Sequence, residues 1–163
     1  LFTSIVMVIS FISCVEDKQD KDLISIQTFI ERYDRTTWTV IEEEMRVYLK
    51  INDNMDKALE LWMSDLELAK LMVHKECFYH SYEMLNTKEV AILENSSDKL
   101  EFTYLDDKTY TFSIDGSRLK LEFKTSDKVR EPVYFSKTTE NVTELTICSE
   151  ESSKGNFDWR FLK

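Results

Sequence analysis

Apolar and polar residues alternate with a period of two through most of this chain, from Thr36 to Ser136. In the clearest run, Leu119, Leu121 and Phe123 are separated by lysine and glutamate. Successive side chains of a strand point to opposite faces, so each run predicts a strand with one apolar and one wet face. Eight or nine such runs occur, at residues 36–40, 45–51, 59–63, 77–82, 90–92, 100–104, 109–114, 119–124 and 133–136.

Short polar breaks separate these runs. The chain has only two glycines and one proline, so most turns must be built from Asn, Asp and Ser. Asp115-Gly116, between two alternating runs, is the strongest hairpin signal. Strands joined by short turns predict an antiparallel, up-and-down meander, and a sheet of this size avoids open edges best by closing on itself. We therefore expect a mainly β fold, an antiparallel barrel of eight or nine strands.

Helical periodicity is confined to short segments. Residues 139–147 predict a helical turn that carries Val142 and Leu145 onto the barrel. Residues 65–75 fit either a short helix or an irregular excursion between strands. Residues 22–33 predict a short N-terminal helix, with apolar positions at Leu23, Ile26, Ile30 and Tyr33.

The N-terminal segment predicts export and anchoring. Residues 1–13 carry no charge and are mostly apolar, which fits the hydrophobic region of a secretory signal but is too short to cross a bilayer. Phe11-Ile12-Ser13-Cys14 resembles the lipobox of bacterial lipoproteins, in which the cysteine is lipidated. An ordinary signal peptide with a chance cysteine is the alternative. No Met or basic residue precedes the apolar run, so we expect that the natural start is missing.

These features divide the chain into four parts. A lipoprotein signal segment covers residues 1–14, and residues 15–22 form a flexible acidic tether. The barrel domain covers residues 23–148, and a C-terminal tail covers residues 149–163, where Phe157, Trp159 and Phe161 alternate with Asp158 and Arg160. The tether resembles the surface-export signal of some lipoproteins, although a plain spacer is equally compatible. We expect an outer-membrane lipoprotein facing the periplasm or the cell exterior.

Charge and cysteine content add two expectations. The net charge is −10, from 21 basic and 31 acidic residues, which argues against nucleic acid as a partner. If Cys14 is lipidated, Cys77 and Cys148 remain, and an exported compartment permits them to form a disulfide. The alternative is two separate reduced thiols.

Several motifs resemble those of small Bacteroidetes lipoproteins with a lipocalin-like barrel. The run from Phe29 to Trp38 is similar to their Phe-x-Glu-Lys-Tyr-Asp-Gly-x-x-Trp stretch, with Arg35 in the place of the glycine. The resemblance covers roughly residues 20–150 and implies a lipocalin-like fold, a lipid anchor and the cysteine pair. It implies no established activity. Further matches are Glu76-Cys77-Phe78-Tyr79, Leu93-Glu94-Asn95-Ser96, Phe135-Ser136-Lys137-Thr138 and Leu145-Thr146-Ile147-Cys148.

The sequence offers no recognisable catalytic site, metal site or cofactor motif. It has no nucleophile elbow, zinc-protease motif or phosphate-binding loop. His74, Cys77 and His80 are spaced three apart, which on a strand places neighbouring members on opposite faces. We therefore expect no enzyme, cofactor or metal centre.

The functional hypothesis depends on the inward face of the barrel. An eight-stranded barrel either has a filled core or holds one small apolar ligand, and both alternatives remain open. We expect a non-enzymatic binding protein for a small apolar ligand or an exported partner. The alternative is an interaction or inhibitor module that displays Tyr48, Trp62, Tyr82 and Tyr134 on its surface. The interior or pocket residues would be Trp38, Leu49, Leu61, Phe102, Tyr104, Tyr110, Phe112 and Phe123.

Overall fold

The computed structural model describes residues 27–42, 44–66, 76–105 and 108–148. These residues are mainly strand, and all strand pairs in the sheet are antiparallel, as the alternation predicted. The nine strands are β1 (Thr36–Glu42), β2 (Met45–Ile51), β3 (Leu59–Asp65), β4 (Tyr79–Glu83), β5 (Val90–Asn95), β6 (Lys99–Tyr104), β7 (Lys108–Asp115), β8 (Arg118–Thr125) and β9 (Val133–Thr138).

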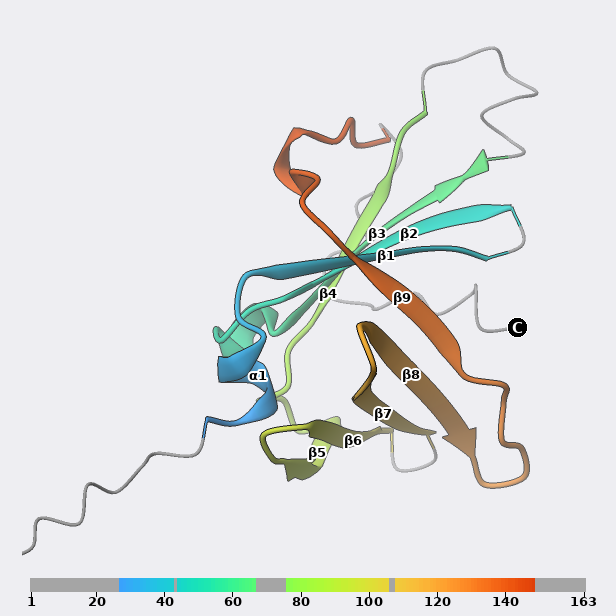
Figure 1. Cartoon of the computed structure of the whole chain (residues 1–163). Coiled ribbons are helices and arrows are strands. Elements are labelled where there is room, and N and C mark those ends of the chain that lie inside the picture. Colours follow the sequence, from blue (N-terminus) through green and yellow to red (C-terminus); the bar gives the residue numbers. More distant parts are fainter. Residues whose placement is uncertain (1–26, 43, 67–75, 106–107, 149–163) are drawn as a thin grey trace, which may run out of the picture.

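The sheet curls into a half-barrel rather than the closed barrel that the strand number predicted. Its strand order is β4-β3-β2-β1-β9-β8-β7-β6-β5, so the first and last strands pair with each other in the middle of the sheet (Figure 1). Every other pair joins consecutive strands, except that β4 and β5 do not pair. These two strands therefore form the edges of the sheet, and we call the opening between them the seam.

The seam follows from the connection between β4 and β5. Residues 84–89 form a six-residue link instead of a tight hairpin turn, and Leu85 in this link is only 2% exposed because it enters the core. The Leu105 N–H then donates to the Glu89 carbonyl oxygen at 3.0 Å, which holds the start of β5 against β6. With Leu85 buried in the core and Glu89 bonded to Leu105, the link runs between β4 and β5, and these two strands do not pair.

Register places the apolar residues on one face of the sheet. Leu49 lies opposite Trp38 on one side and Leu61 on the other, and Phe112 lies opposite Leu100 and Leu121. Directly opposed residues share a face, so these side chains all point into the half-barrel. They belong to one buried cluster that runs from Phe29 to Phe135.

The N-terminal helix is shorter than predicted. In the described residues it spans only α1 (Phe29–Arg32), because Thr28 is extended and caps it. The Glu31 N–H donates to Thr28 Oγ1 at 3.4 Å, and the Thr28 N–H donates to Glu31 Oε2 at 2.8 Å. Phe29 and Ile30 are buried, so α1 covers one end of the core (Figure 1).

Two short 3-10 helices complete the described elements. η1 (Met55–Lys57) joins β2 to β3, and η2 (Val142–Glu144) lies within the segment where a helical turn was expected. Asn54 and Asn141 cap them by accepting a backbone N–H two residues ahead, at 3.0 Å and 3.2 Å.

The β7–β8 hairpin contains the turn signalled by Asp115-Gly116, in a shifted position. Asp115 pairs with Arg118 as the last residue of β7, so the loop is Gly116-Ser117. Gly116 has φ of +61°, which fits a type II′ turn with glycine first. The glycine is therefore required by the backbone and not by crowding, since a Cβ there would meet nothing within 4 Å.

Replacing Gly116 with alanine is expected to lower the free energy of unfolding by about 1 kcal/mol, because an L-residue is disfavoured at positive φ. Urea unfolding of Gly116→Ala measures this effect. Ser117→Ala, one residue away in the same exposed loop, is the control and should leave stability nearly unchanged. Equal stability of the two variants would contradict the turn assignment.

Several predictions fall on residues outside the described ranges. They are the signal segment with Cys14, the tether, the tail 149–163 and most of the ambiguous segment 65–75. Within the described ranges, no helix has the length and apolar character needed to span a bilayer.

Candidate functional site

The eight residues predicted to line the barrel interior all lie in or against the buried cluster. Trp38, Leu49, Leu61, Phe102, Tyr110 and Phe112 are at most 3% exposed. Tyr104 and Phe123 are partly buried and pack against the same cluster. These eight residues therefore lie on the inward face of the half-barrel.

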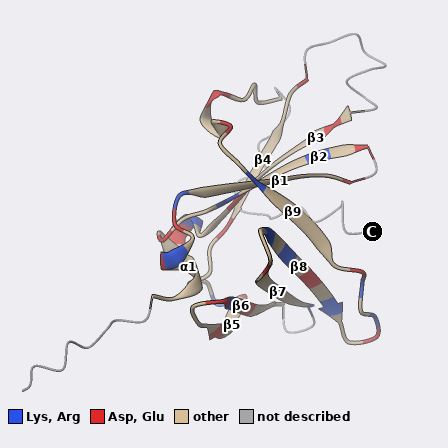
Figure 2. Cartoon of the chain, viewed as in Figure 1, with Lys and Arg blue, Asp and Glu red and all other residues tan. Residues whose placement is uncertain are grey.

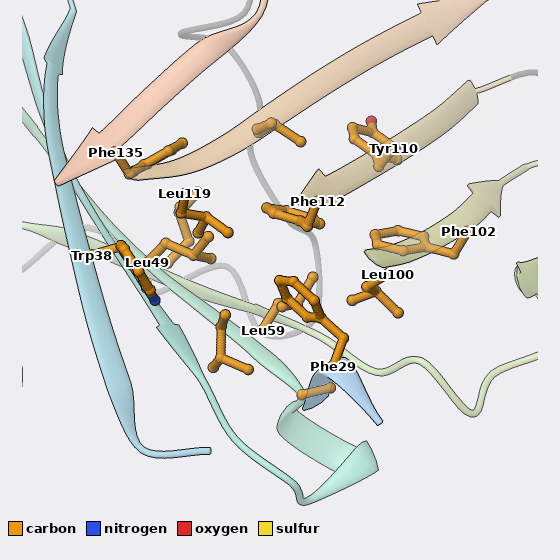
Figure 3. Packing of buried hydrophobic residues seen from close by; sticks show 14 of the residues in the cluster. Phe29, Trp38, Leu49, Leu59, Leu100, Phe102, Tyr110, Phe112, Leu119 and Phe135 are labelled. Carbon is orange, nitrogen blue, oxygen red and sulfur yellow. The ribbon is translucent and has the colours of Figure 1, made fainter. Parts of the chain in front are cut away.

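These side chains contact one another as in a packed core. Phe102 stacks on Tyr110 and Phe112, with ring centroids 5.3 Å and 6.3 Å apart (Figure 3). The Tyr110 and Phe123 ring centroids are 5.0 Å apart. Phe29 of α1 reaches the same group from the end of the half-barrel (Figure 3). Of the two alternatives for the interior, the geometry favours the filled core.

A pocket of about 530 Å³ lies instead outside the core, where β1 begins and β2 and β9 end. Thr37 lies opposite both Lys50 and Thr138, so these three side chains share the outer face of the sheet. The chain leaving β9, residues 139–143, forms the opposite wall. We call this feature the outer pocket; its volume falls in the range of small-molecule sites.

Polar and cationic residues dominate the outer pocket. Arg35, Lys50 and Lys137 line it together with five threonines and Asn141, and Glu140 is its one acidic lining residue. Figure 2 shows the basic segments at the turn that enters β1 and where β1 crosses β9. In a chain of net charge −10, this concentration of cations favours an anionic ligand.

Arg35 occupies the outer pocket in a strained backbone conformation. Its φ of 58° lies in the left-handed region, although it is neither glycine nor asparagine. The turn is fixed from both sides: the Arg35 N–H donates to the Ile51 carbonyl oxygen at 2.8 Å, and Asp34 Oδ1 accepts the Asp53 N–H at 3.0 Å. Strain of this kind concentrates at functional sites.

The Arg35 guanidinium remains available to a ligand. Its Nε pairs with Asp34 Oδ2 at 3.2 Å, and the side chain is 86% exposed. Because Asp34 is held by the Asp53 backbone, the ion pair orients the guanidinium at the rim of the pocket.

Tyr48 and Glu140 connect the far wall of the pocket to the sheet. The Tyr48 hydroxyl donates a hydrogen bond to Glu140 Oε2. Burial, followed by this bond and the Glu140 charge, raises the pKa of Tyr48 to about 12, so the phenol stays protonated and remains a donor.

A second apolar cluster holds the wall of the pocket in place. Tyr48, Trp62, Phe78 and Val142 are each at most 5% exposed and pack together on the outer face, with Leu145 against them. Cys77 is joined by a disulfide to Cys148, with the two Cα atoms 5.0 Å apart. We call this group the outer cluster.

The outer cluster corrects one expectation about the surface. Tyr48 and Trp62 were expected to be exposed contact residues, but they are 3% and 5% exposed. Alternation placed them correctly on the outer face, which the segment 139–148 then covers. Tyr82 and Tyr134 are half-buried.

A buried carboxyl group lies at the seam. Glu83 lies opposite Leu59 and therefore points inward, and it is 7% exposed. Burial, with a smaller contribution from the Glu89 charge, raises the pKa of Glu83 to about 7. The Tyr104 hydroxyl donates to Glu89 at 3.4 Å, so the three groups form one cluster.

The histidine–cysteine motif is engaged in other interactions. Cys77 is in the disulfide, and His80 Nε2 lies 3.1 Å from Glu60 Oε2 while its ring stacks on Trp62. His74 lies outside the described residues. The part of the chain that the structure describes contains no group of three His, Cys, Asp or Glu residues suited to hold a metal ion.

Sequence reasoning missed the outer pocket and Glu83, although each left a signal. Arg35 stands at the glycine position of the resemblance, which marks a left-handed turn. Tyr79, Ser81 and Glu83 are alternate residues of β4, so Glu83 shares their inward face of the strand. The pocket walls come together only in the folded chain.

Comparisons with protein-family models, curated proteins and solved structures found no match to this chain.

Proposed function

We propose that this chain is a lipid-anchored envelope protein that binds a small anionic ligand in the outer pocket. Support for the anchor comes from the lipobox-like Cys14 and from the Cys77–Cys148 disulfide, which fits an oxidising compartment. The curled antiparallel sheet is compatible with a lipocalin-like origin. The ligand class follows from the outer pocket.

The observation that carries the proposal is the strained Arg35 at the rim of a cationic pocket. A left-handed L-residue costs roughly 1–2 kcal/mol relative to the ordinary backbone regions. Glycine would remove this cost, and we propose that the arginine side chain offsets it by binding the ligand. A guanidinium binds carboxylate and phosphate groups through parallel hydrogen bonds.

The rest of the pocket adds cationic and hydroxyl groups that can bind a polar anion. Lys50 adds a second cation beside Thr37 and Thr138, whose hydroxyl groups can donate or accept. The interior offers the apolar alternative little support, because its side chains contact one another. A carboxylate or phosphate compound that carries hydroxyl groups fits both the charge and the volume.

Replacing Arg35 with glycine should separate binding from stability. We expect Arg35→Gly to bind inorganic phosphate and glucuronate roughly tenfold more weakly, since hydrogen bonds to charged groups contribute about 1.5–3 kcal/mol. The free energy of unfolding of the same variant should be about 1 kcal/mol higher, because the backbone strain is gone. Isothermal titration calorimetry and urea unfolding measure the two effects.

Two controls make the experiment decisive. Lys124→Gln removes an exposed cation on β8 that does not line the pocket, and it should change neither measurement. Glucose, the neutral counterpart of glucuronate, should bind neither protein. The proposal fails if the unaltered chain binds neither anion, or if Arg35→Gly binds them equally well.

A further inference from the structure

The outer pocket carries both signs of charge, and they lie on opposite walls. The cations come from the sheet: Arg35 from the turn that enters β1, Lys50 from β2 and Lys137 from β9. The acidic residue, Glu140, belongs to the segment 139–143 that forms the other wall. Within the described residues, no ion pair joins Glu140 to any of the three cations. The pocket therefore offers separate positive and negative groups to a ligand.

Two hydrogen bonds hold Glu140 in its wall. Its backbone N–H donates to Thr138 Oγ1 at 3.1 Å, and its Oε2 accepts from the Tyr48 hydroxyl. Because the pKa of Tyr48 is raised to about 12, the phenol remains a donor at neutral pH. Val142, two residues further on, is 4% exposed in the outer cluster and anchors the same segment. A side chain held in this way loses little further freedom when a ligand contacts it.

The Glu140 carboxylate keeps acceptor capacity for a ligand. An ionised carboxylate has about four lone-pair sites, and the Tyr48 hydroxyl uses one of them. An ammonium group supplies three N–H donors together with a positive charge. Hydrogen bonds that involve ionised partners are roughly twice as strong as those between neutral groups. An ammonium group is therefore a suitable partner for this wall of the pocket.

We propose that the ligand of the outer pocket is a zwitterion of net negative charge, whose phosphate or carboxylate group contacts Arg35 and Lys50 and whose ammonium group contacts Glu140. This inference rests on the proposed function, because it takes over the anion-binding role of Arg35. Three cations against one carboxylate match a ligand with more negative than positive charge. Thr37 and Thr138, beside Lys50, can bind hydroxyl groups of the same molecule. A phosphorylated amino sugar combines all of these groups.

Three sugars that differ by one group at a time test the assignment. Glucosamine 6-phosphate carries a phosphate and an ammonium group, glucose 6-phosphate has a hydroxyl in place of the ammonium, and glucosamine lacks the phosphate. Isothermal titration calorimetry in a mildly acidic buffer keeps the amine protonated. We expect the unaltered chain to bind glucosamine 6-phosphate roughly tenfold more tightly than either of the other two, because each of them lacks one charged contact.

Matched variants assign the preference to Glu140. Glu140→Gln removes the charge and keeps an oxygen acceptor for the Tyr48 hydroxyl. In this variant the preference for glucosamine 6-phosphate over glucose 6-phosphate should disappear, while glucose 6-phosphate binds at least as tightly as before. A merely structural role for Glu140 would instead weaken both phosphates equally. Glu144→Gln is the control: it removes an exposed carboxylate of the same segment that does not line the pocket, retains an acceptor for Asn141, and should leave the preference unchanged.

The possible results separate this inference from the proposed function. Equal binding of the two phosphates by the unaltered chain, with Arg35→Gly still weakening both, would overturn the zwitterion and leave the anion site intact. A preference that persists in Glu140→Gln would also overturn it, since another group would then hold the ammonium. If neither phosphate binds, the proposed function fails together with the inference. The same holds if glucosamine binds as tightly as its phosphate, because the anionic group would then contribute nothing.

Discussion

Removing the disulfide, by replacing Cys77 and Cys148 together with alanine, is expected to lower the free energy of unfolding by about 4 kcal/mol. The two cysteines are 71 residues apart, so the cross-link restricts a long loop in the unfolded chain. Restriction of that size corresponds to roughly 4 kcal/mol on the chain-entropy model. Guanidinium unfolding of the full-length double variant measures the loss.

We expect the outer pocket to depend on the cross-link as well. Residues 139–143 form one wall of the pocket, and Cys148 is the covalent tie that returns this segment to the sheet. Without it, Trp62 and Tyr48 would lose the cover that makes them 5% and 3% exposed. We therefore expect a red-shifted tryptophan emission and lost phosphate binding along with the lower stability.

Val142→Ala is the matched control for this prediction. Val142 is 4% exposed in the outer cluster, and its truncation removes packing while the loop stays closed. It should cost about 1 kcal/mol, in the range for deletion of small buried groups. A double cysteine variant no less stable than Val142→Ala would contradict a structural role for the disulfide.

The strands were predictable because their signal is local. A period of two appears in runs such as Leu119 to Phe123, and it fixes which side chains share a face before any partner is known. The same alternation correctly assigned Tyr48 and Trp62 to the outer face. It could not show that a segment about 90 residues later covers them, so facing outward was mistaken for exposure.

The opening of the sheet was not predictable for a related reason. Strand count and short turns favour closure, but closure depends on whether β4 and β5 meet. In the folded chain they do not meet, and Leu85, in the link between them, is buried in the core. Nothing in the periodicity of either strand reports on the packing of that link. The outer pocket likewise forms only when the start of β1 and the ends of β2 and β9 lie together in the folded chain.

Glu83 should make the folded chain progressively less stable as the pH rises from about 4.5 to about 7. Its pKa is raised from 4.5 to about 7, chiefly by burial and then by the Glu89 charge. In this window the unfolded chain has released the proton and the folded chain still holds it. Since the folded state then binds more protons, the free energy of unfolding falls with pH. The stabilisation is complete below pH 4.5 and is lost as the pH passes 7.

Glu83→Gln should remove this slope. Glutamine keeps the shape and stays neutral, so the variant should match the unaltered chain near pH 4 and exceed its stability by about 3 kcal/mol at pH 8. Urea unfolding at a series of pH values measures the difference. A slope that persists in Glu83→Gln would show that another group is responsible.

Glu89→Gln separates the two causes of the shift. Glu89 is exposed beside Glu83, and its removal eliminates the like charge without changing the burial of Glu83. Because burial is the larger cause, most of the pH dependence should remain in this variant. The Tyr104 hydroxyl, which donates to Glu89, keeps an oxygen acceptor in the glutamine, so its bond should survive. If Glu89→Gln instead abolished the slope, repulsion between the two carboxylates at the seam, and not the apolar interior, would control the proton on Glu83.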